Sequence, residues 1–159
     1  MEHQFLKIVD NEILIPGLEK TYTMIQISDP HLIVVDENST LERVQKANEQ
    51  ADFVIVCPHW GTEYQHNQSQ EQEYWAKLFL DHGVDLVIGT HPHYIQPVEM
   101  LTNENGEQML VYYSLGNFIN STSDSGRGTA DRMIGGMAKV TVGKKETGEV
   151  YIKEYGVEP

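Results

Sequence analysis

The stretch ADFVIVCPHWGTEY, residues 51–64, decides the fold class of this 159-residue chain. Its first part, residues 52–57, is a continuous apolar run, which is typical of a β-strand buried on both faces of a sheet. Polar residues follow where that strand is expected to end, among them His59 and Glu63. A buried strand with chemically active side chains at its carboxyl end indicates an α/β fold with a ligand site at that edge of the sheet.

The segments on either side alternate between helical and strand patterns. Residues 39–51 and 69–83 carry apolar residues at helical spacing, and each segment begins with a serine that can cap a helix. Further strands are predicted over residues 21–28, 84–89 and 108–116, followed by a hairpin of residues 135–143 and 148–157. This order predicts a mixed, largely parallel central sheet flanked by helices, with a C-terminal β-hairpin.

Local patterns predict how the two helices begin, face the core and end. Ser39 and Glu42 have the spacing of a capping box, and Ser69 is the predicted cap of the second helix. Gly83 is placed to end that helix. The apolar stripe of the second helix is predicted to consist of Tyr74, Trp75, Leu78 and Phe79.

Composition and charge exclude several classes of protein. About 40% of the residues are apolar and 22% are charged, as in ordinary globular proteins. The formal net charge of −13 disfavours binding to nucleic acid or to anionic lipid. No run approaches the ~20 apolar residues of a membrane span, and the start of the chain has no signal-peptide pattern. We therefore expect a single domain over residues 1–159, without a membrane segment.

Polar side chains recur where the predicted strands end. His59 and Glu63 follow the strand at 52–57, His91 and His93 follow the strand at 84–89, and Asn117 follows the strand at 108–116. The carboxyl ends of parallel strands meet at one edge of a sheet, so these side chains are expected to lie close together. Neutral imidazoles combined with carboxylates suit Zn, Mn or Fe. The sequence therefore predicts a divalent metal site at this edge.

The strand predicted at 21–28 ends in a similar way, with Asp29 and His31. Both side chains are candidate metal ligands. They are equally consistent with an ordinary turn after a strand, in which Asp29 accepts backbone hydrogen bonds.

Three blocks of the sequence resemble one known family. HWGTEY at 59–64, GTHPHYIQP at 89–97 and YSLGNF at 113–118 resemble the poly-gamma-glutamate capsule-synthesis family of the CapA type, whose members are similar in fold to calcineurin-like metallophosphatases. The resemblance implies a metal-dependent hydrolase of the phosphoesterase type, with one or two Mn, Fe or Zn ions. It also implies a role in the biosynthesis of a poly-gamma-glutamate capsule or another anionic cell-surface polymer.

The same resemblance implies roles for individual residues. His59, His91 and His93 would be metal ligands, and His59, Glu63 and Asn117 would serve catalysis. The substrate would be an anionic small molecule or polymer, the partners would be capsule-synthesis proteins, and the location would be the bacterial cell surface or membrane.

Residues 1–35 depart from the family pattern. The G-D strand end and the N-L-E motif that precede the three blocks in the family do not occur, so we expect a partial or truncated domain. The stretch MIQISDPHL instead resembles the first strand of calcineurin-like phosphatases, which implies metal binding by Asp29 and His31. Two other interpretations remain: a non-catalytic binding or assembly module of a capsule-synthesis system, and a truncated domain whose histidines serve only packing.

Overall fold

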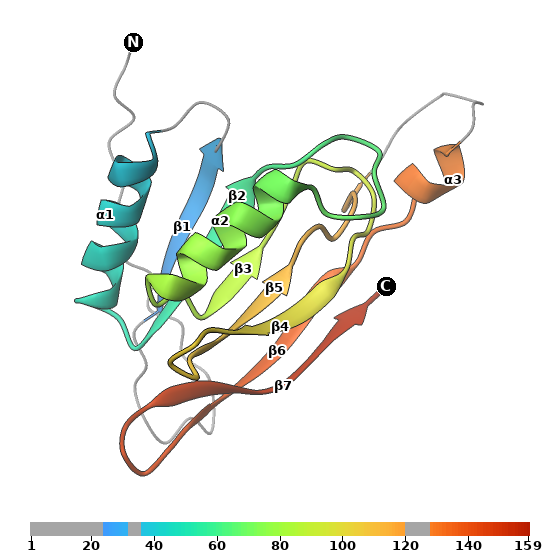
Figure 1. The fold of residues 1–159 in the computed structure, drawn as a ribbon. Helices are drawn as coiled ribbons and strands as arrows, with labels where there is room; N and C mark the ends of the chain where they lie inside the picture. Colours follow the sequence, from blue (N-terminus) through green and yellow to red (C-terminus); the bar gives the residue numbers. More distant parts are fainter. Residues whose placement is uncertain (1–23, 32–35, 120–127) are drawn as a thin grey trace.

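The computed structural model describes residues 24–31, 36–119 and 128–159, with the backbone alone described over 24–31. Ten elements follow one another along these residues (Figure 1). They are β1 (Met24–His31), α1 (Glu37–Asn48), β2 (Phe53–His59), α2 (Gln70–Asp81), β3 (Leu86–Ile88), β4 (Val98–Thr102), β5 (Gln108–Tyr112), α3 (Thr129–Arg132), β6 (Met137–Lys144) and β7 (Val150–Glu158).

The central sheet has five strands in the order β1-β2-β3-β5-β4. The strands β1, β2, β3 and β5 run parallel, and β4 pairs antiparallel with β5 at one edge. The strands β6 and β7 form a separate antiparallel hairpin. The predicted mixed, largely parallel sheet with a C-terminal hairpin is therefore confirmed.

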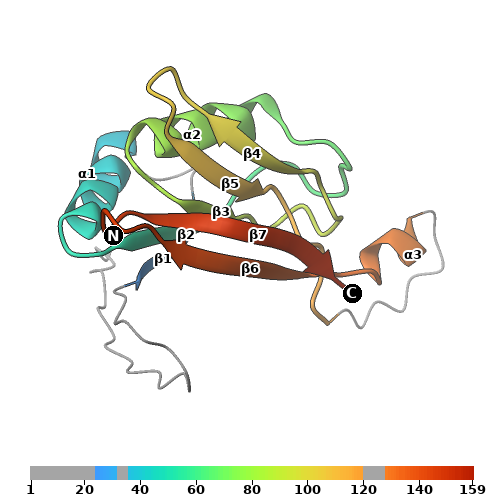
Figure 2. The ribbon, with the colours of Figure 1, turned by 90° about the horizontal axis from the view of Figure 1, so that it is seen from below.

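The molecule has three layers, which Figure 2 shows edge-on: α1 and α2, then the central sheet, then the hairpin. Alternation along β2 produces this arrangement, because successive side chains of a strand point to opposite faces. Val54 and Val56 join the core beneath the helices, whereas Phe53 and Ile55 join the core against the hairpin. Both helices thus cover one face of the sheet, and the hairpin covers the other.

The second helix is capped as its sequence predicts. The Ser69 hydroxyl accepts a hydrogen bond from the backbone N–H of Gln72 at 3.2 Å, and the Gln72 side chain accepts one from the backbone N–H of Ser69 at 2.9 Å. Gly83 follows the helix with a φ of +80°, a left-handed conformation that favours glycine. Gln72 also belongs to a buried hydrogen-bond network at the start of this helix.

Two predictions for the helices were wrong. The first helix is capped by Asp36 and not by Ser39: a carboxylate oxygen of Asp36 accepts from the backbone N–H of Ser39 at 3.0 Å. Asp36 is as good a capping residue as serine and lies one turn earlier, so the helix begins there. Tyr74 does not join the apolar stripe, because it is 53% exposed and its hydroxyl donates to Glu37 at 2.9 Å.

The sequence patterns also missed a strand and overextended two others. β4 was not predicted; it forms against β5, where Val98 pairs with Tyr112 and Thr102 with Gln108. β3 and β5 are shorter than the ranges 84–89 and 108–116. The residues after each of these strands turn away to build the loops of the candidate site. Within the described residues, no helix is long and apolar enough to span a membrane.

Candidate metal site

Backbone hydrogen bonds join the carboxyl end of β2 to the loop that follows β3. The backbone N–H of Thr90 donates to the carbonyl of Pro58 at 2.9 Å, and that of Trp60 donates to the carbonyl of Thr90 at 3.2 Å. His59 and Thr90 form a parallel bridge. The two histidine-bearing strand ends predicted to meet at one edge are therefore held side by side.

Trp60 and Gly89 allow the loops after β2 and β3 to pack closely against the chain at Tyr113. Trp60 is fully buried, and its indole N–H donates to the carbonyl of Tyr113 at 2.9 Å. A Cβ atom at position 89 would lie only 2.1 Å from the same carbonyl. Glycine is required there because the backbone of β3 approaches β5 and the Trp60 ring so closely. Trp60 is thus a packing residue that anchors the loop carrying Glu63.

Three side chains converge beyond these strand ends. One ligand atom from each of Glu63, His91 and His93 lies within 4.8 Å of the others. Nε2 of His93 is 4.0 Å from a carboxylate oxygen of Glu63. Both histidines are half-buried, whereas Glu63 is exposed. Two imidazoles and one carboxylate are a donor set that fits a first-row divalent metal and leaves positions for water or substrate.

Three residues in these two loops have a left-handed backbone conformation. His91 has a φ of 98°, His93 a φ of 59° and Tyr64 a φ of 61°. Left-handed backbone at residues other than glycine costs on the order of 1–3 kcal/mol and is found where the surroundings enforce it. Here the backbone N–H of Tyr64 donates to the carbonyl of Pro92 at 2.7 Å, which ties the Glu63 loop to the His91–Pro92–His93 turn.

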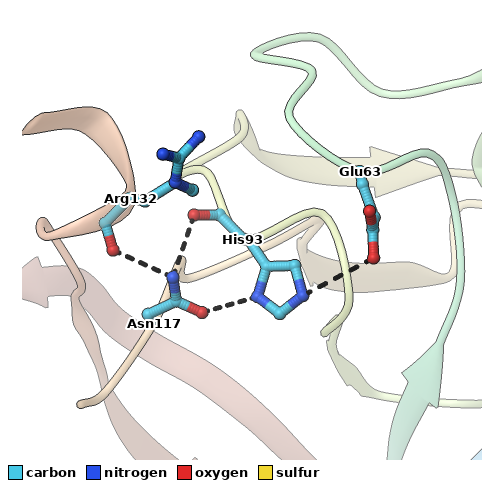
Figure 3. Close-up of polar contacts among 4 residues, drawn as sticks. All are labelled: Glu63, His93, Asn117 and Arg132. Atoms are coloured by element: carbon cyan, nitrogen blue, oxygen red, sulfur yellow. Dashed lines mark hydrogen bonds and ion pairs between the residues drawn. The ribbon is translucent and has the colours of Figure 1, made fainter. Parts of the chain in front are cut away.

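Asn117 fixes the proton on the His93 ring (Figure 3). The Asn117 amide donates to the carbonyl of Arg132 at 2.9 Å, and this carbonyl can only accept. The oxygen of the amide therefore faces Nδ1 of His93, at 2.6 Å, and Nδ1 must carry the proton. In the neutral ring the lone pair is then on Nε2, the atom that faces Glu63.

His59 lies beside this group, with its ring centroid 4.4 Å from that of His91. Among the residues that the structure describes, the three convergent ligand atoms come from Glu63, His91 and His93, and metal binding by His59 stays a prediction. In the β1–β2 pairing, His31 is the backbone partner of His59, so β1 ends at the same edge of the sheet. The side chains of Asp29 and His31 lie outside the described part of the chain, and metal binding by them stays a prediction.

A stacked pair of side chains that the sequence did not single out borders the group. The Tyr64 ring stacks on the His93 ring, with centroids 5.9 Å apart, and the guanidinium of Arg132 lies 5.2 Å from the Tyr64 ring centroid. The sequence patterns predict for Tyr64 either packing or a pocket wall, and they predict no role for Arg132. It follows Asn117 by 15 residues, across a glycine-rich stretch that carries no pattern linking the two.

A buried glutamine network holds the loop between Glu63 and α2. The side-chain amide of Gln96 donates to the carbonyls of Gln65 and Asn67, both at 3.0 Å. Its oxygen accepts from the side chain of Gln72 at 2.8 Å. Gln72 is fully buried and Gln96 is 3% exposed. The sequence feature that could have indicated this network is Gln96, a polar residue within the block GTHPHYIQP at a position where packing alone favours an apolar residue.

Comparison with known proteins identifies the family of this chain. The profile of the family described as "Bacterial capsule synthesis protein PGA_cap" matches residues 11–122, and the chain belongs to this family. It is 34% identical over 90 residues to the "PGA biosynthesis protein CapA" of Bacillus subtilis (strain 168) and 35% identical over 94 residues to the "Capsule biosynthesis protein CapA" of Bacillus anthracis. Each match covers 57% of this chain, and the chain spans 22% of the length of each relative.

Proposed function

We propose that this chain carries the metal site of a hydrolase of the phosphoesterase type that serves the synthesis of an anionic capsule polymer. The observation that carries the proposal is the convergence of Glu63, His91 and His93 within 4.8 Å. Membership of the capsule synthesis family and the names of the two relatives support the process. The reaction is our inference from the chemistry of the donor set.

The state of His93 supports metal binding over simple packing. A histidine that coordinates a metal usually donates its other N–H to an oxygen acceptor, which fixes the ring and makes the ligand nitrogen more basic. Asn117 is that acceptor here. Asn117 is therefore a positioning residue, and Nε2 of His93 is the ligand atom. His91 and Glu63 complete the group, and Mn, Fe and Zn are the ions that this mixture of nitrogen and oxygen donors suits.

When bound, such an ion lowers the pKa of a bound water and polarises an ester oxygen. The chain's own residues do the rest. One carboxylate oxygen of Glu63 belongs to the ligand group, and the other would accept a proton from an attacking water. His59, beside His91, is placed to hold or donate a second proton. Asp29 and His31, on the adjacent strand end, are proposed ligands of a second ion.

Metal content is the first test. After incubation with Mn, Fe(II) or Zn and removal of unbound ions, the full chain is expected to retain stoichiometric metal. His93→Ala should lose it. His82→Ala is the matched control, because His82 ends α2 and bonds to the carbonyl of Leu78 instead. Metal-free protein under all three conditions would reject the proposal.

Activity is the second test. Metal-loaded protein is expected to hydrolyse p-nitrophenyl phosphate or bis(p-nitrophenyl) phosphate. The rate should fall with Glu63→Gln, which removes the basic carboxylate but keeps one oxygen donor, so its metal content should fall less than that of His93→Ala. Stoichiometric metal without turnover on either ester would instead favour the second candidate, a non-catalytic binding module. The small share of the relatives that this chain spans keeps that candidate in view.

A further inference from the structure

We propose that a groove between α2 and the edge strand β4 binds an aliphatic polyamine, a ligand that carries several ammonium groups on a methylene chain. The groove has a volume of about 650 Å³, which is in the range of small-molecule sites. Its lining does not include Glu63, His91 or His93. The groove is therefore a second site, separate from the proposed metal ligands, and it can be tested in the absence of metal.

The alternation of side chains along β4 produces the acidic floor of the groove. Met100 packs against the hairpin core, whereas Leu101 packs against the core beneath the helices. Successive side chains of a strand point to opposite faces, so Glu99 faces the helix layer together with Leu101. β4 is the edge strand of the sheet, and the space between it and α2 is lined by Leu80 from the helix and by Glu99 and Leu101 from the strand.

The lining of the groove is predominantly negative. Lys77 is the one cationic side chain in it, against the four carboxylates of Glu73, Asp81, Glu99 and Glu104. Glu73 accepts a hydrogen bond from the side-chain amide of Gln68 at 3.3 Å, and the other three carboxylates have no hydrogen-bond or ion-pair partner among the described residues. Charges of one sign in a cleft raise the local concentration of the opposite ion, so the groove attracts cations.

Tyr113 places an unpartnered hydroxyl in the same groove. The residue is only 2% exposed, yet its hydroxyl has no hydrogen-bond partner among the described residues. In that part of the chain no fully buried side-chain polar atom lacks a partner, so this hydroxyl must reach open space, and Tyr113 lines the groove. A buried tyrosine hydroxyl usually has a partner, and a ligand in the groove would provide one.

The Tyr113 hydroxyl stays protonated when a cation is bound. Burial raises the pKa of Tyr113 to about 12, and the nearby carboxylates of Glu99 and Glu73 contribute to the rise. A neutral phenol can accept a hydrogen bond from an ammonium group through its oxygen and donate its own proton to a carboxylate. Tyr113 thus suits a ligand that brings N–H donors into an acidic groove.

The spacing of the carboxylates favours an extended cation over a metal ion. A bound metal requires several donor atoms close together, and among the described residues the group with three such atoms within 4.8 Å is Glu63, His91 and His93. The carboxylates of the groove are instead spread along α2, β4 and the turn after it. A linear polyamine can place its ammonium groups at separate carboxylates, while its methylene groups cover Leu80 and Leu101.

Calorimetric titration of the metal-free full chain with spermidine tests this site. The wild type is expected to bind spermidine, and Glu99→Gln should weaken binding about tenfold, which corresponds to about 1.4 kcal/mol. Tyr113→Phe removes only the hydroxyl and should weaken binding about threefold, as expected for one hydrogen bond. Glu146→Gln makes the same charge change in the exposed turn between β6 and β7 and should stay within about twofold.

The matched control separates the groove from the general attraction of an acidic chain for polycations. Absence of spermidine binding in the wild type would overturn the proposal, and so would equal losses in Glu99→Gln and Glu146→Gln. Thermal unfolding checks that each variant is folded; if Glu99→Gln is not, Tyr113→Phe decides, and unchanged affinity in that variant rejects the site.

Titration with MgCl₂ at matched ionic strength distinguishes a polyamine from an inorganic cation. Saturable Mg²⁺ binding that disappears in Glu99→Gln would reassign the groove to a metal ion and overturn the polyamine proposal. Failure of His91 and His93 to bind metal would reject the proposed function and leave the result with spermidine unchanged.

Discussion

Asn117 holds His93 in a single tautomer, through a bond of 2.6 Å from Nδ1 of the ring to the amide oxygen. The amide cannot turn over without placing its NH₂ group against the ring N–H and its oxygen against the carbonyl of Arg132. A segment 15 residues further along the chain thereby determines which nitrogen of His93 is available to a metal.

Asn117→Ala should weaken metal binding about 10–100-fold, because loss of a partner that orients a ligand has effects of this size. The measurement is the dissociation constant for Zn or Mn by competition with a chelator. Asn105→Ala, at the exposed turn between β4 and β5, is the control and should leave the constant unchanged. Equal affinities in the wild type and Asn117→Ala would show that the bond does not prepare His93 for a metal.

Gln96→Leu should lower the free energy of unfolding by about 2–3 kcal/mol, because it leaves two backbone carbonyls without their donor and removes one of the two acceptors of the Gln72 amide group. It should also weaken metal binding, since the loop beside Glu63 loses its tether. Urea unfolding and metal titration measure the two effects. Gln68→Leu is the matched control, because Gln68 makes only an exposed bond to Glu73. If Gln96→Leu kept its free energy of unfolding but bound metal more weakly, the result would still support the role of Gln96 in holding this loop. If both the free energy of unfolding and the metal affinity were unchanged, that role would be rejected.

Replacing His91 separates backbone strain from ligand loss. Both His91→Ala and His91→Gly remove the imidazole, but only glycine adopts a φ near 98° without strain. We expect His91→Gly to be more stable than His91→Ala by about 1 kcal/mol in thermal or urea unfolding of the metal-free protein. At Tyr74, on the exposed face of α2, the same pair of substitutions should show the usual order, with alanine more stable. If His91→Ala were instead the more stable variant, the backbone at position 91 would have lost its left-handed conformation on substitution.

Stability should depend on pH through Asp85, at the start of β3. Burial raises the pKa of Asp85 from 3.8 to about 6, although the N–H of Val54 donates to its carboxylate at 2.7 Å. Between these values the folded state binds more protons than the unfolded state, so the contribution of this group to stability falls as pH rises from about 4 to 6. Asp85→Asn avoids that loss and still accepts the bond from Val54.

Asp85→Asn should therefore gain about 1–2 kcal/mol relative to the wild type at pH 8, and the gain should vanish near pH 4. Urea unfolding at several pH values measures it. Asp81→Asn, at the exposed end of α2, controls for the change in net charge. A gain that is constant with pH would show that the carboxyl group of Asp85 titrates normally.

The sequence predicted what depends on local chemistry. The cap at Ser69, the glycine stop at Gly83 and the buried apolar strand β2 are each encoded within a few residues. The meeting of the two histidine-bearing loops also followed from the rule that parallel strands end at one edge. The start of the first helix failed because Asp36 and Ser39 are both good caps, and nothing local chooses between them.

The features that the sequence did not predict depend on residues far apart. β4 exists because β5 offers it a partner, and a five-residue segment with weak alternation carries little signal of its own. The stack of Arg132 on Tyr64 joins positions 68 residues apart. His59 lies at the strand end as expected, beside the ligand atoms of Glu63, His91 and His93 that converge among the described residues, and its own role as a ligand stays a prediction.

The tether from Gln96 attaches to main-chain carbonyls at positions 65 and 67 and makes no use of the side chains there. Both side chains are exposed. The identities of these two residues can therefore drift during evolution, or be randomised in a library, while the neighbouring Glu63 keeps its place. Under the proposed function, substitutions in this loop would alter selectivity for substrates and leave the proposed metal ligands in position.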